Sequence, residues 1–359
     1  MNPSSDQEDN RPKLAPLLIT MGDAAGIGPE IIARAFLDSP DEMADCVVVG
    51  DMAILRRAAR IVSSAVPLPM ALLDSILDAA ALPPCCIGLL QKCGLLSQLP
   101  FGRVSGLAGK AAGDCIVWAA RAVLRGDAAG MVTAPIHKEA LAASGSDFAR
   151  YPGHTELLQG EAAAFLGVPI SELPVRMMLA NDELKTVLVS IHLSLRDAIE
   201  AVTFDNVLQT LRITHRTLQA TLGRAPRIGV AGLNPHAGEG GLFGSEELAI
   251  IAPAIAAARA EGIAASGPFA PDTVFMRARN TPAQAGEFDV VVAMYHDQGL
   301  IPVKYLGVEQ GVNVTLGLPI LRTSPDHGTA FDIAGTGRGD ASSLIAAVRM
   351  ARRLSLVNR

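Results

Sequence analysis

The sequence predicts an α/β protein with two interwoven α/β/α domains around mostly parallel sheets. Short apolar segments with strand character alternate with helical segments, which favours a parallel sheet flanked by helices. The 359 residues exceed the usual size of one core. No internal repeat or low-complexity linker interrupts the pattern. We therefore expect a flexible tail (1–13), a first domain (14–135 and 297–359) and a second domain (136–296).

The first predicted unit is a strand, a glycine-rich loop and a helix. Residues 14–20 are apolar, the loop MGDAAGIGPE follows, and a helix is expected over 30–37. Pro29 suits the first turn of that helix. The loop fits either an anion cradle at a helix N-terminus or a plain tight connection. Its spacing matches neither G-x-G-x-x-G nor a Walker A motif.

The remaining elements alternate in the same way. Residues 62–108 show no clear pattern, and residues 267–273 are predicted as a loop that carries Asp272. The other predicted strands cover 46–50, 130–133, 176–179, 185–191, 227–232 and 290–294, and the other long helices cover 52–61, 109–124, 204–222 and 246–261.

Composition and charge exclude several functions. Hydrophobic residues make up 50% of the chain and charged residues 18%, which describes a compact globule. A net charge of −6 gives no general attraction to nucleic acid or to an anionic membrane. No apolar stretch approaches the roughly 20 residues of a membrane span. We expect a cytoplasmic protein with five reduced cysteines, because the CC-x6-C spacing at 85–93 lacks the paired motif of a metal knot.

The histidines gather at strand ends and in loops rich in glycine or proline. Of the seven, His215 alone lies inside a helical pattern. His192, His236 and His296 each follow an apolar strand. Because the ends of such strands can meet at one edge of a sheet, we expect the three imidazoles to converge on a divalent metal with open positions for catalysis. The alternative for any single histidine is a hydrogen bond to a nearby carbonyl.

Two later segments predict anion binding. Lys304, Asn313 and Arg322 follow one another at intervals of nine residues in segments expected to be mostly extended. They are candidates to line one pocket for a phosphate or carboxylate, and solvated surface charge is the alternative. Residues 325–337 form a long loop with closely spaced glycines, which suits close approach of a ligand's phosphates or adenine.

Together these motifs resemble one known family. The chain contains, in order from about residue 17 to 350, the segments MGDAAGIGPE, TAPIHKEAL, PGHTE, IHLSLRD, GLNPHAGEGG, YHDQGL, GVNVTLGLP and RTSPDHGTAFDIAG. This set is similar to that of the 4-hydroxythreonine-4-phosphate dehydrogenase family, and GLNPHAGEGG with YHDQG is its most specific part. The family's fold is like that of isocitrate and isopropylmalate dehydrogenases.

The resemblance implies a metal-dependent dehydrogenase that uses NAD or NADP. It also implies a homodimer with active sites near the subunit boundary and in the cleft between domains. The metal would be zinc, or else cobalt, magnesium, manganese or nickel. The implied positions are His192, His236 and His296 for the metal, His154, Thr155, Lys304, Asn313 and Arg322 for the substrate, and His327, Gly328, Thr329, Asp332 and Gly335 for the cofactor.

The expected reaction oxidises a secondary alcohol on a substrate that bears a terminal phosphate. For 4-phosphohydroxy-L-threonine the product is a 2-amino-3-oxo acid phosphate, which decarboxylates, as in pyridoxal phosphate biosynthesis. We expect Lys304 to neutralise charge or relay a proton. Asp272 and Asp297 are candidates to orient a metal-bound imidazole.

Other substrates and classes stay open at this point. Met21 stands where the best-known family members have proline, and Ala24 stands where a proline is usual. Met21, together with TAPIHKEAL and VSIHLSLRD, looks closer to a branch that acts on D-threonate or D-erythronate 4-phosphate. A metal-dependent phosphatase or hydrolase would also need histidines and a basic pocket, but it would have no use for the loop at 325–337. A metal that only braces the fold would need a fourth protein ligand.

Overall fold

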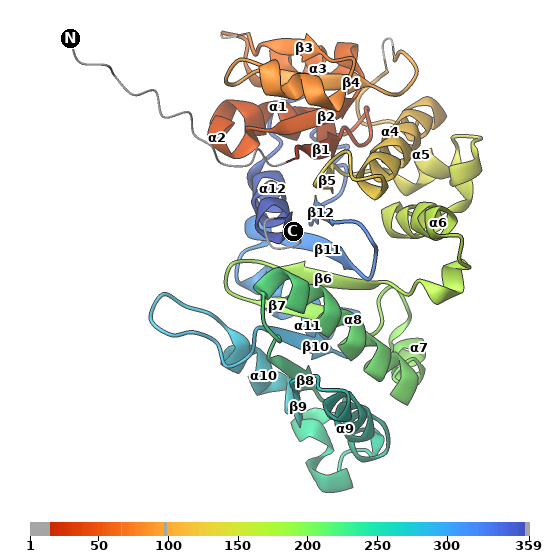
Figure 1. The fold of residues 1–359 in the computed structure, drawn as a ribbon, viewed down its shortest axis with the longest axis vertical. Helices are drawn as coiled ribbons and strands as arrows, with labels where there is room; N and C mark the ends of the chain where they lie inside the picture. The colour runs from red at the N-terminus through yellow and green to blue at the C-terminus, as the bar shows by residue number, and fades with distance from the viewer. Residues whose placement is uncertain (1–14, 66, 97–98, 356–359) are drawn as a thin grey trace, which may run out of the picture.

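One twelve-stranded sheet runs along the molecule (Figure 1). The computed structural model describes residues 15–65, 67–96 and 99–355, so the predicted tail lies outside the described residues. Helices lie along the sheet: α4 packs on β1, β2 and β5, and α12 packs on β5, β11 and β12. This arrangement confirms the predicted α/β class.

The strand order is β3-β4-β2-β1-β5-β12-β11-β6-β7-β10-β8-β9. Pairing is parallel from β3 to β12 and from β7 to β9, and antiparallel between β12 and β7. The strands are β1 Leu17–Thr20, β2 Cys46–Gly50, β3 Met70–Leu72, β4 Ile87–Gln91, β5 Gly130–Thr133, β6 Arg176–Ala180, β7 Lys185–Leu188, β8 Ile228–Ala231, β9 Ala265–Phe269, β10 Val290–Ala293, β11 Val312–Leu316 and β12 Arg322–Pro325.

Helices connect most of these strands. The longer ones are α1 Gly28–Asp38, α3 Met52–Val62, α4 Gly106–Leu124, α6 His154–Leu166, α8 Phe204–Leu222, α9 Ala252–Ala260, α10 Pro271–Ala278, α11 His296–Tyr305 and α12 Ser342–Ser355. The shorter ones are α2 Pro40–Met43, α5 Lys138–Ala142, α7 Leu195–Glu200 and the turns η1 Ile76–Ala81, η2 Asp147–Arg150, η3 Ile170–Glu172, η4 Pro235–Gly241, η5 Glu247–Ile251 and η6 Val308–Gln310.

The central strands are buried because their sequences are apolar on both faces. β2 reads CVVVG, β10 reads VVVA, and every residue of both strands is buried. Such continuous runs of β-branched residues are typical of parallel strands covered by helices on both sides. Local signals then begin the helices: the Asp51 carboxylate accepts a hydrogen bond from the Ile54 amide at 2.9 Å and caps α3.

The chain returns to the centre of the sheet after building both ends. β12 pairs with β5 on one side and with β11 on the other, and β11 pairs with β6. In Figure 1 these late segments, drawn in blue, lie between the red and green parts of the molecule. The predicted boundaries of the two domains stay a prediction.

Two predicted local structures are wrong. The loop predicted over 267–273 is instead the end of β9, which pairs with β8, followed by α10 from Pro271. The segment ASGPF lacks apolar alternation, so pairing with β8 decides its strand character. Lys304 lies in α11 and not in an extended segment. An internal Pro302 disfavours a helix, and packing on β6, β7 and β10 overrides that preference.

The helix predicted over 246–261 begins with a π-helical turn, η5.

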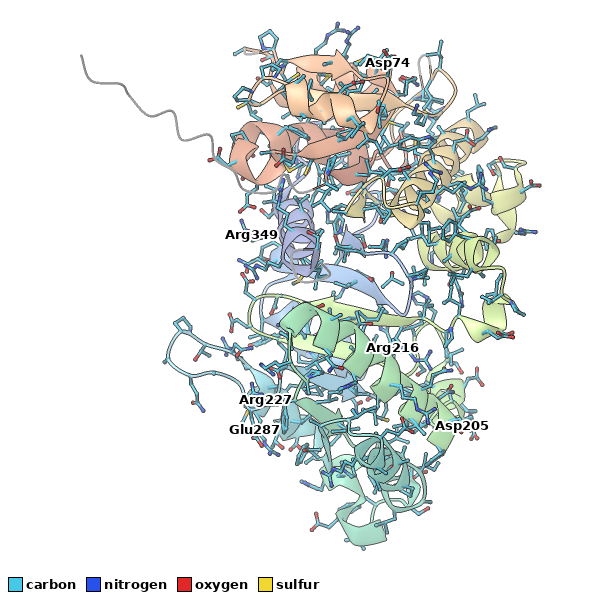
Figure 2. All side chains as sticks on the ribbon, viewed as in Figure 1. Asp74, Asp205, Arg216, Arg227, Glu287 and Arg349 are labelled. Carbon is cyan, nitrogen blue, oxygen red and sulfur yellow. The ribbon has the colours of Figure 1, made fainter. Side chains whose placement is uncertain are left out.

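The N-terminal ends of β8 and β10 carry ion pairs. Figure 2 shows Arg227 and Glu287 beside each other there. Arg224 donates to Asp289 at 2.8 Å, and the Arg227 amide donates to the same carboxylate at 2.7 Å. Burial raises the pKa of Asp289, but hydrogen bonds from both arginines outweigh it and hold the pKa well below its usual range. This edge is opposite the one that carries the predicted histidines.

The cysteines form no disulfide, as predicted. All five are free thiols, and Cys46 and Cys115 are buried. Burial raises the pKa of Cys46 to about 11, so this thiol stays protonated near neutral pH. Across the described ranges, no helix has both the length and the apolar character to cross a membrane.

Candidate functional site

Two of the predicted histidines lie together at the C-terminal ends of neighbouring strands. β7 and β10 are parallel; His192 follows β7, and His296 follows β10 as the first residue of α11. Their ring centroids are 6.0 Å apart. The Ser190 hydroxyl donates to the Met294 carbonyl at 3.0 Å and ties the two strand ends together. This edge is where ligands bind in parallel α/β sheets.

The surroundings of His192 favour its neutral imidazole. Burial lowers the pKa of His192, and the charges of Lys138 and His296 lower it further, against an opposing effect of Glu156. His296 Nδ1 lies 2.7 Å from a carboxylate oxygen of Asp297. With its proton on Nδ1, His296 donates to Asp297 and leaves Nε2 free. A carboxylate behind an imidazole is a usual arrangement for a metal ligand.

The third predicted histidine, His236, lies in the turn η4 that follows β8. After β8, in η4, His236, Ala237 and Glu239 take left-handed conformations with φ of 53°, 53° and 42°. Residues other than glycine rarely hold this geometry, and it clusters at functional sites. In the part of the chain that the structure describes, no three His, Cys, Asp or Glu side chains come close enough together to hold a metal ion. The three-histidine centre therefore stays a prediction.

Two side chains support the loop that carries His236. The buried Glu247 carboxylate accepts the amide hydrogens of Leu233 at 2.7 Å and Asn234 at 2.8 Å. Burial raises the pKa of Glu247, but these bonds and one from the Asn234 side chain hold it below its usual range. Gln298 accepts from the Met294 amide and donates to the Gly232 carbonyl, at 2.7 and 2.8 Å. The motifs GLNPH and YHDQ are thus joined by direct contacts.

The predicted anion residue Arg322 is a buried cation. Only 4% of its surface is exposed. Its guanidinium donates to the hydroxyls of Thr133 at 2.7 Å and Thr315 at 3.1 Å. None of the described carboxylates forms an ion pair with it. Burial lowers the pKa of Arg322 to about 10, while Glu156 opposes the shift. A buried cation held by neutral hydroxyls has unused capacity for an anion.

The first turn of α6 places the PGHTE motif beside this arginine. Burial, and then the charge of Arg322, lower the pKa of His154 well below its usual range. His154 Nε2 is buried and has no hydrogen-bond partner among the described residues. Thr155 and Glu156 follow in the same turn. Glu156 affects both Arg322 and His192, so it links the anion site with the histidine pair.

Of the other two predicted anion residues, Asn313 lies on β11 and Lys304 lies in α11. Asn313 and Thr315 are two positions apart in β11, so their side chains lie on the same face of the strand, and Thr315 contacts Arg322. Lys304 forms an ion pair of 2.8 Å with Asp326, just beyond β12. Asn313 therefore shares a face with the arginine contact, whereas the charge of Lys304 is already partly balanced.

The predicted cofactor loop packs against the first glycine-rich loop. The Glu30 carboxylate, buried in α1, accepts the amide hydrogens of Gly335 at 2.5 Å and Gly337 at 2.8 Å. The Ile27 amide donates to the Thr329 carbonyl at 3.0 Å. A Cβ added at Gly26 would lie 2.9 Å from Thr329, so only glycine permits this approach. The two loops form one continuous wall.

The remaining predicted residues of this loop are more open. His327 Nδ1 lies 3.0 Å from the Gly328 carbonyl oxygen, and His327 Nε2 is buried without a partner among the described residues. Asp332 is exposed. Asp272 is also exposed, in the first turn of α10 rather than in the predicted loop, where packing of α10 against η4 brings its helix near the His236 loop.

Sequence reasoning missed several residues of this region. Lys138 and Glu156 act on His192 through their charges, and Glu30 and Glu247 fix two of the loops. Lys138 and Glu156 lie within TAPIHKEAL and PGHTE, so those motifs held the signal. Glu30 and Glu247 look like ordinary carboxylates of helical segments in the sequence. Their hydrogen-bond partners lie in other segments, so no local pattern marks them.

The fold and this edge define an α/β enzyme with its polar groups gathered at strand ends. Comparison with known proteins agrees: residues 42–351 match the family model described as pyridoxal phosphate biosynthetic protein PdxA. The chain belongs to this family.

Individual relatives cover almost the whole chain. The 4-hydroxythreonine-4-phosphate dehydrogenase of Beijerinckia indica is 52% identical over 95% of both chains. The D-threonate 4-phosphate dehydrogenase of Cupriavidus necator is 45% identical over 94% of this chain and 96% of its own. Among solved structures, the 4-hydroxythreonine-4-phosphate dehydrogenase from Klebsiella pneumoniae has a TM-score of 0.82 at 40% identity, over 95% of this chain and 98% of its own. These relatives bear the names of dehydrogenases, as the sequence motifs predict.

Proposed function

We propose that this protein is an NAD(P)-dependent dehydrogenase that oxidises 4-phosphohydroxy-L-threonine to a 2-amino-3-oxo acid phosphate, which then loses carbon dioxide. The observation that carries this proposal is the buried guanidinium of Arg322, which hydroxyls hold and no described carboxylate neutralises. An anionic substrate would supply the missing negative charge. The names of the relatives specify phosphorylated substrates, which supports an anionic substrate, and the name of the relative from Beijerinckia indica supports 4-phosphohydroxy-L-threonine.

The histidine pair suits a divalent metal in part. His192 and His296 would hold it, with His236 as the predicted third ligand and Asp297 orienting His296. A metal held there would lower the pKa of the substrate alcohol and would stabilise negative charge on a neighbouring oxygen. Three imidazoles accept zinc and also cobalt or nickel, so the physiological ion is a matter for measurement.

The side chains of the protein would position the substrate and move its proton. Arg322 and Asn313 would hold an anionic end, and His154 would donate or accept through its unpartnered Nε2. Glu156, whose charge acts on both Arg322 and His192, would take the hydroxyl proton. The loop at 325–337 would hold NAD or NADP, which would supply the acceptor for a hydride from the substrate carbon. The β-keto acid that results loses carbon dioxide.

We further propose that the protein acts as a homodimer. Large apolar side chains are exposed beside both histidine loops: Leu193 and Leu195 follow His192, and Leu242 and Phe243 follow the His236 turn, with exposed fractions between 48% and 73%. Exposed apolar side chains gathered in this way are typical of protein interfaces. Light scattering at several protein concentrations would measure the assembly.

D-threonate 4-phosphate is the second candidate substrate. Two observations favour it: the relative from Cupriavidus necator, and Met21 in the first loop. Met21 is fully buried, and its sulfur accepts a hydrogen bond from the Asp51 amide at 3.4 Å. Met21 therefore shapes the first loop, which packs against the proposed cofactor loop.

The test is an absorbance assay at the reduced-nicotinamide band. The substrates are 4-phosphohydroxy-L-threonine, D-threonate 4-phosphate and D-erythronate 4-phosphate, each with NAD and NADP, with and without a chelator. We expect reduction of one cofactor with the first substrate and loss of the signal with chelator. Reduction only with a sugar-acid phosphate would select the second candidate. Phosphate release without cofactor reduction would instead identify a phosphatase and overturn both.

A further inference from the structure

Two polar side chains flank the point where the strand order of the sheet reverses. From β1 the chain moves outward to β2, and it later returns through α4 to β5, on the other side of β1. Asp23 lies just after β1, and His137 lies just after β5. The crevice between two such strands, beyond their carboxyl ends, is where open α/β sheets bind ligands.

The two loops are fixed to each other by the backbone. The Asp23 amide donates to the Pro135 carbonyl at 2.9 Å, and the Ala25 amide donates to Asp23 Oδ1 at 2.8 Å. Gly22 has a φ of +74°, and a Cβ there would lie 2.5 Å from the Pro135 oxygen. The Asp23 carboxyl is therefore held in one place by its own loop.

Both side chains keep a buried atom without a partner. Asp23 is 1% exposed, and its Oδ2 has no hydrogen-bond partner among the described residues; the same holds for His137 Nδ1. Burial raises the pKa of Asp23, against opposing effects of the Ala25 amide and of His137. A buried carboxyl oxygen left unpaired in the protein is an acceptor, or when protonated a donor, that a ligand can satisfy.

The ring of His137 is fixed against the proposed cofactor loop. It stacks on Phe331 with ring centroids 4.6 Å apart and an interplanar angle of 16°. The next residue, Lys138, lies close enough to His192 to lower its pKa. His137 thus contacts the loop at 325–337, while its neighbour Lys138 acts on one member of the histidine pair. We take this to be the side where the reacting end of a dinucleotide would meet the substrate.

We propose that Asp23 Oδ2 and His137 Nδ1 bind the vicinal hydroxyls of the nicotinamide-side ribose of the cofactor. This inference rests on the proposed function, because it takes the dinucleotide to lie along the loop at 325–337. Two fixed polar atoms suit a rigid diol, and the stacked Phe331 holds the imidazole in place before the ligand arrives. Asp23, in the loop after β1, is then the carboxyl group that accepts a hydrogen bond from the ribose, and the loop at 325–337 does not supply it.

Titration calorimetry with two nucleotide fragments tests the pair. ADP-ribose contains the second ribose and ADP lacks it. The variants are Asp23→Asn and His137→Phe; the latter keeps an aromatic ring on Phe331 and removes Nδ1. His215→Phe is the matched control, because His215 Nδ1 is also buried without a partner among the described residues but lies on α8. Thermal unfolding checks that each variant is folded.

We expect ADP-ribose to bind roughly tenfold or more weakly to both variants, and ADP to bind within about twofold of wild type. His215→Phe should leave both affinities unchanged. Unchanged ADP-ribose affinity in either folded variant, or an equal loss for ADP, would overturn the assignment. A wild type that binds ADP-ribose through this pair but reduces no nicotinamide cofactor would support the pair and overturn the proposed function.

Discussion

The guanidinium of Arg322 lies close enough to the imidazole of His154 for its charge to lower the pKa of that histidine. His154 keeps an unpartnered, buried Nε2, and the arginine has no described carboxylate partner. Both groups therefore carry a cost in the free protein that a bound anion would relieve. At Arg322 and His154, the features that favour binding of an anion therefore lower the stability of the free protein.

Replacing Arg322 should affect the stability of the protein and its affinity for the substrate differently. Arg322→Met keeps a long side chain and removes a buried cation that lacks an ion-pair partner, so the free energy of unfolding should change by less than about 1 kcal/mol or rise. The value of kcat/KM for a phosphorylated substrate should fall by about 100-fold or more. Urea unfolding and steady-state kinetics measure the two effects. A variant that is strongly destabilised but fully active would contradict this account.

The pKa of His154 predicts how stability depends on pH. Because the pKa is lowered in the folded protein, the unfolded chain takes up a proton first as the pH falls. Stability is full above about pH 6.5, the ordinary pKa of histidine, and is lost as the pH falls toward the lower folded pKa, by at most about 1.4 kcal/mol per pH unit. Urea unfolding from pH 7.5 to 5 should show a shallower slope for His154→Gln. Arg322→Met should remove only part of the dependence of stability on pH, because it removes the charge of Arg322 while His154 stays buried. Equal slopes in all three proteins would refute the assignment.

Asp297 should affect metal affinity through His296. Asp297→Asn removes the carboxylate that faces His296 Nδ1, and we expect metal to bind about 10-fold to 100-fold more weakly. Competition with a chromophoric chelator measures the affinity for zinc and cobalt. Asp74→Asn, at the far end of the molecule in Figure 2, is the control and should bind as wild type. Equal affinities for both variants would remove Asp297 from the site.

Asp289 should be important for stability but not for chemistry. Asp289→Asn weakens bonds from Arg224 and Arg227, which should lower the free energy of unfolding by about 1–3 kcal/mol at pH 7. Because the folded pKa of Asp289 is depressed, this stabilisation is present above about pH 3.8 and fades as the pH falls below it. Asp182→Asn, whose pair with Arg353 is exposed on both sides, should cost under about 0.5 kcal/mol. Similar losses in both variants would contradict the prediction.

Much of the fold could be predicted because local patterns and packing agree. VVVA in β10 is apolar on both faces, and the strand begins where predicted and ends one residue earlier than predicted, at Ala293. The helix over 204–222 has the predicted bounds. Where local preference and packing disagree, the sequence misleads: Pro302 lies inside α11, and ASGPF pairs as a strand.

The sequence indicated single polar residues of the candidate site but not how they are arranged in space. Strand ends indicated His192 and His296, which the structure brings together. The left-handed turn at His236 has no clear sequence signal, because three of its members are not glycine. The contact between Arg322 and Thr133 joins residues 189 positions apart, and no local pattern encodes it.

The place of β12 also has a consequence for biosynthesis. β5 leaves the ribosome early, yet one of its two neighbours, β12, ends at Pro325 and emerges only when most of the chain has been made. Until then the inner edge of the first half of the sheet exposes unpaired amides and carbonyls, which invite pairing with other chains. The nascent protein should therefore depend on chaperones until the final strands arrive, and a chain that stops before β12 should aggregate rather than yield a folded fragment.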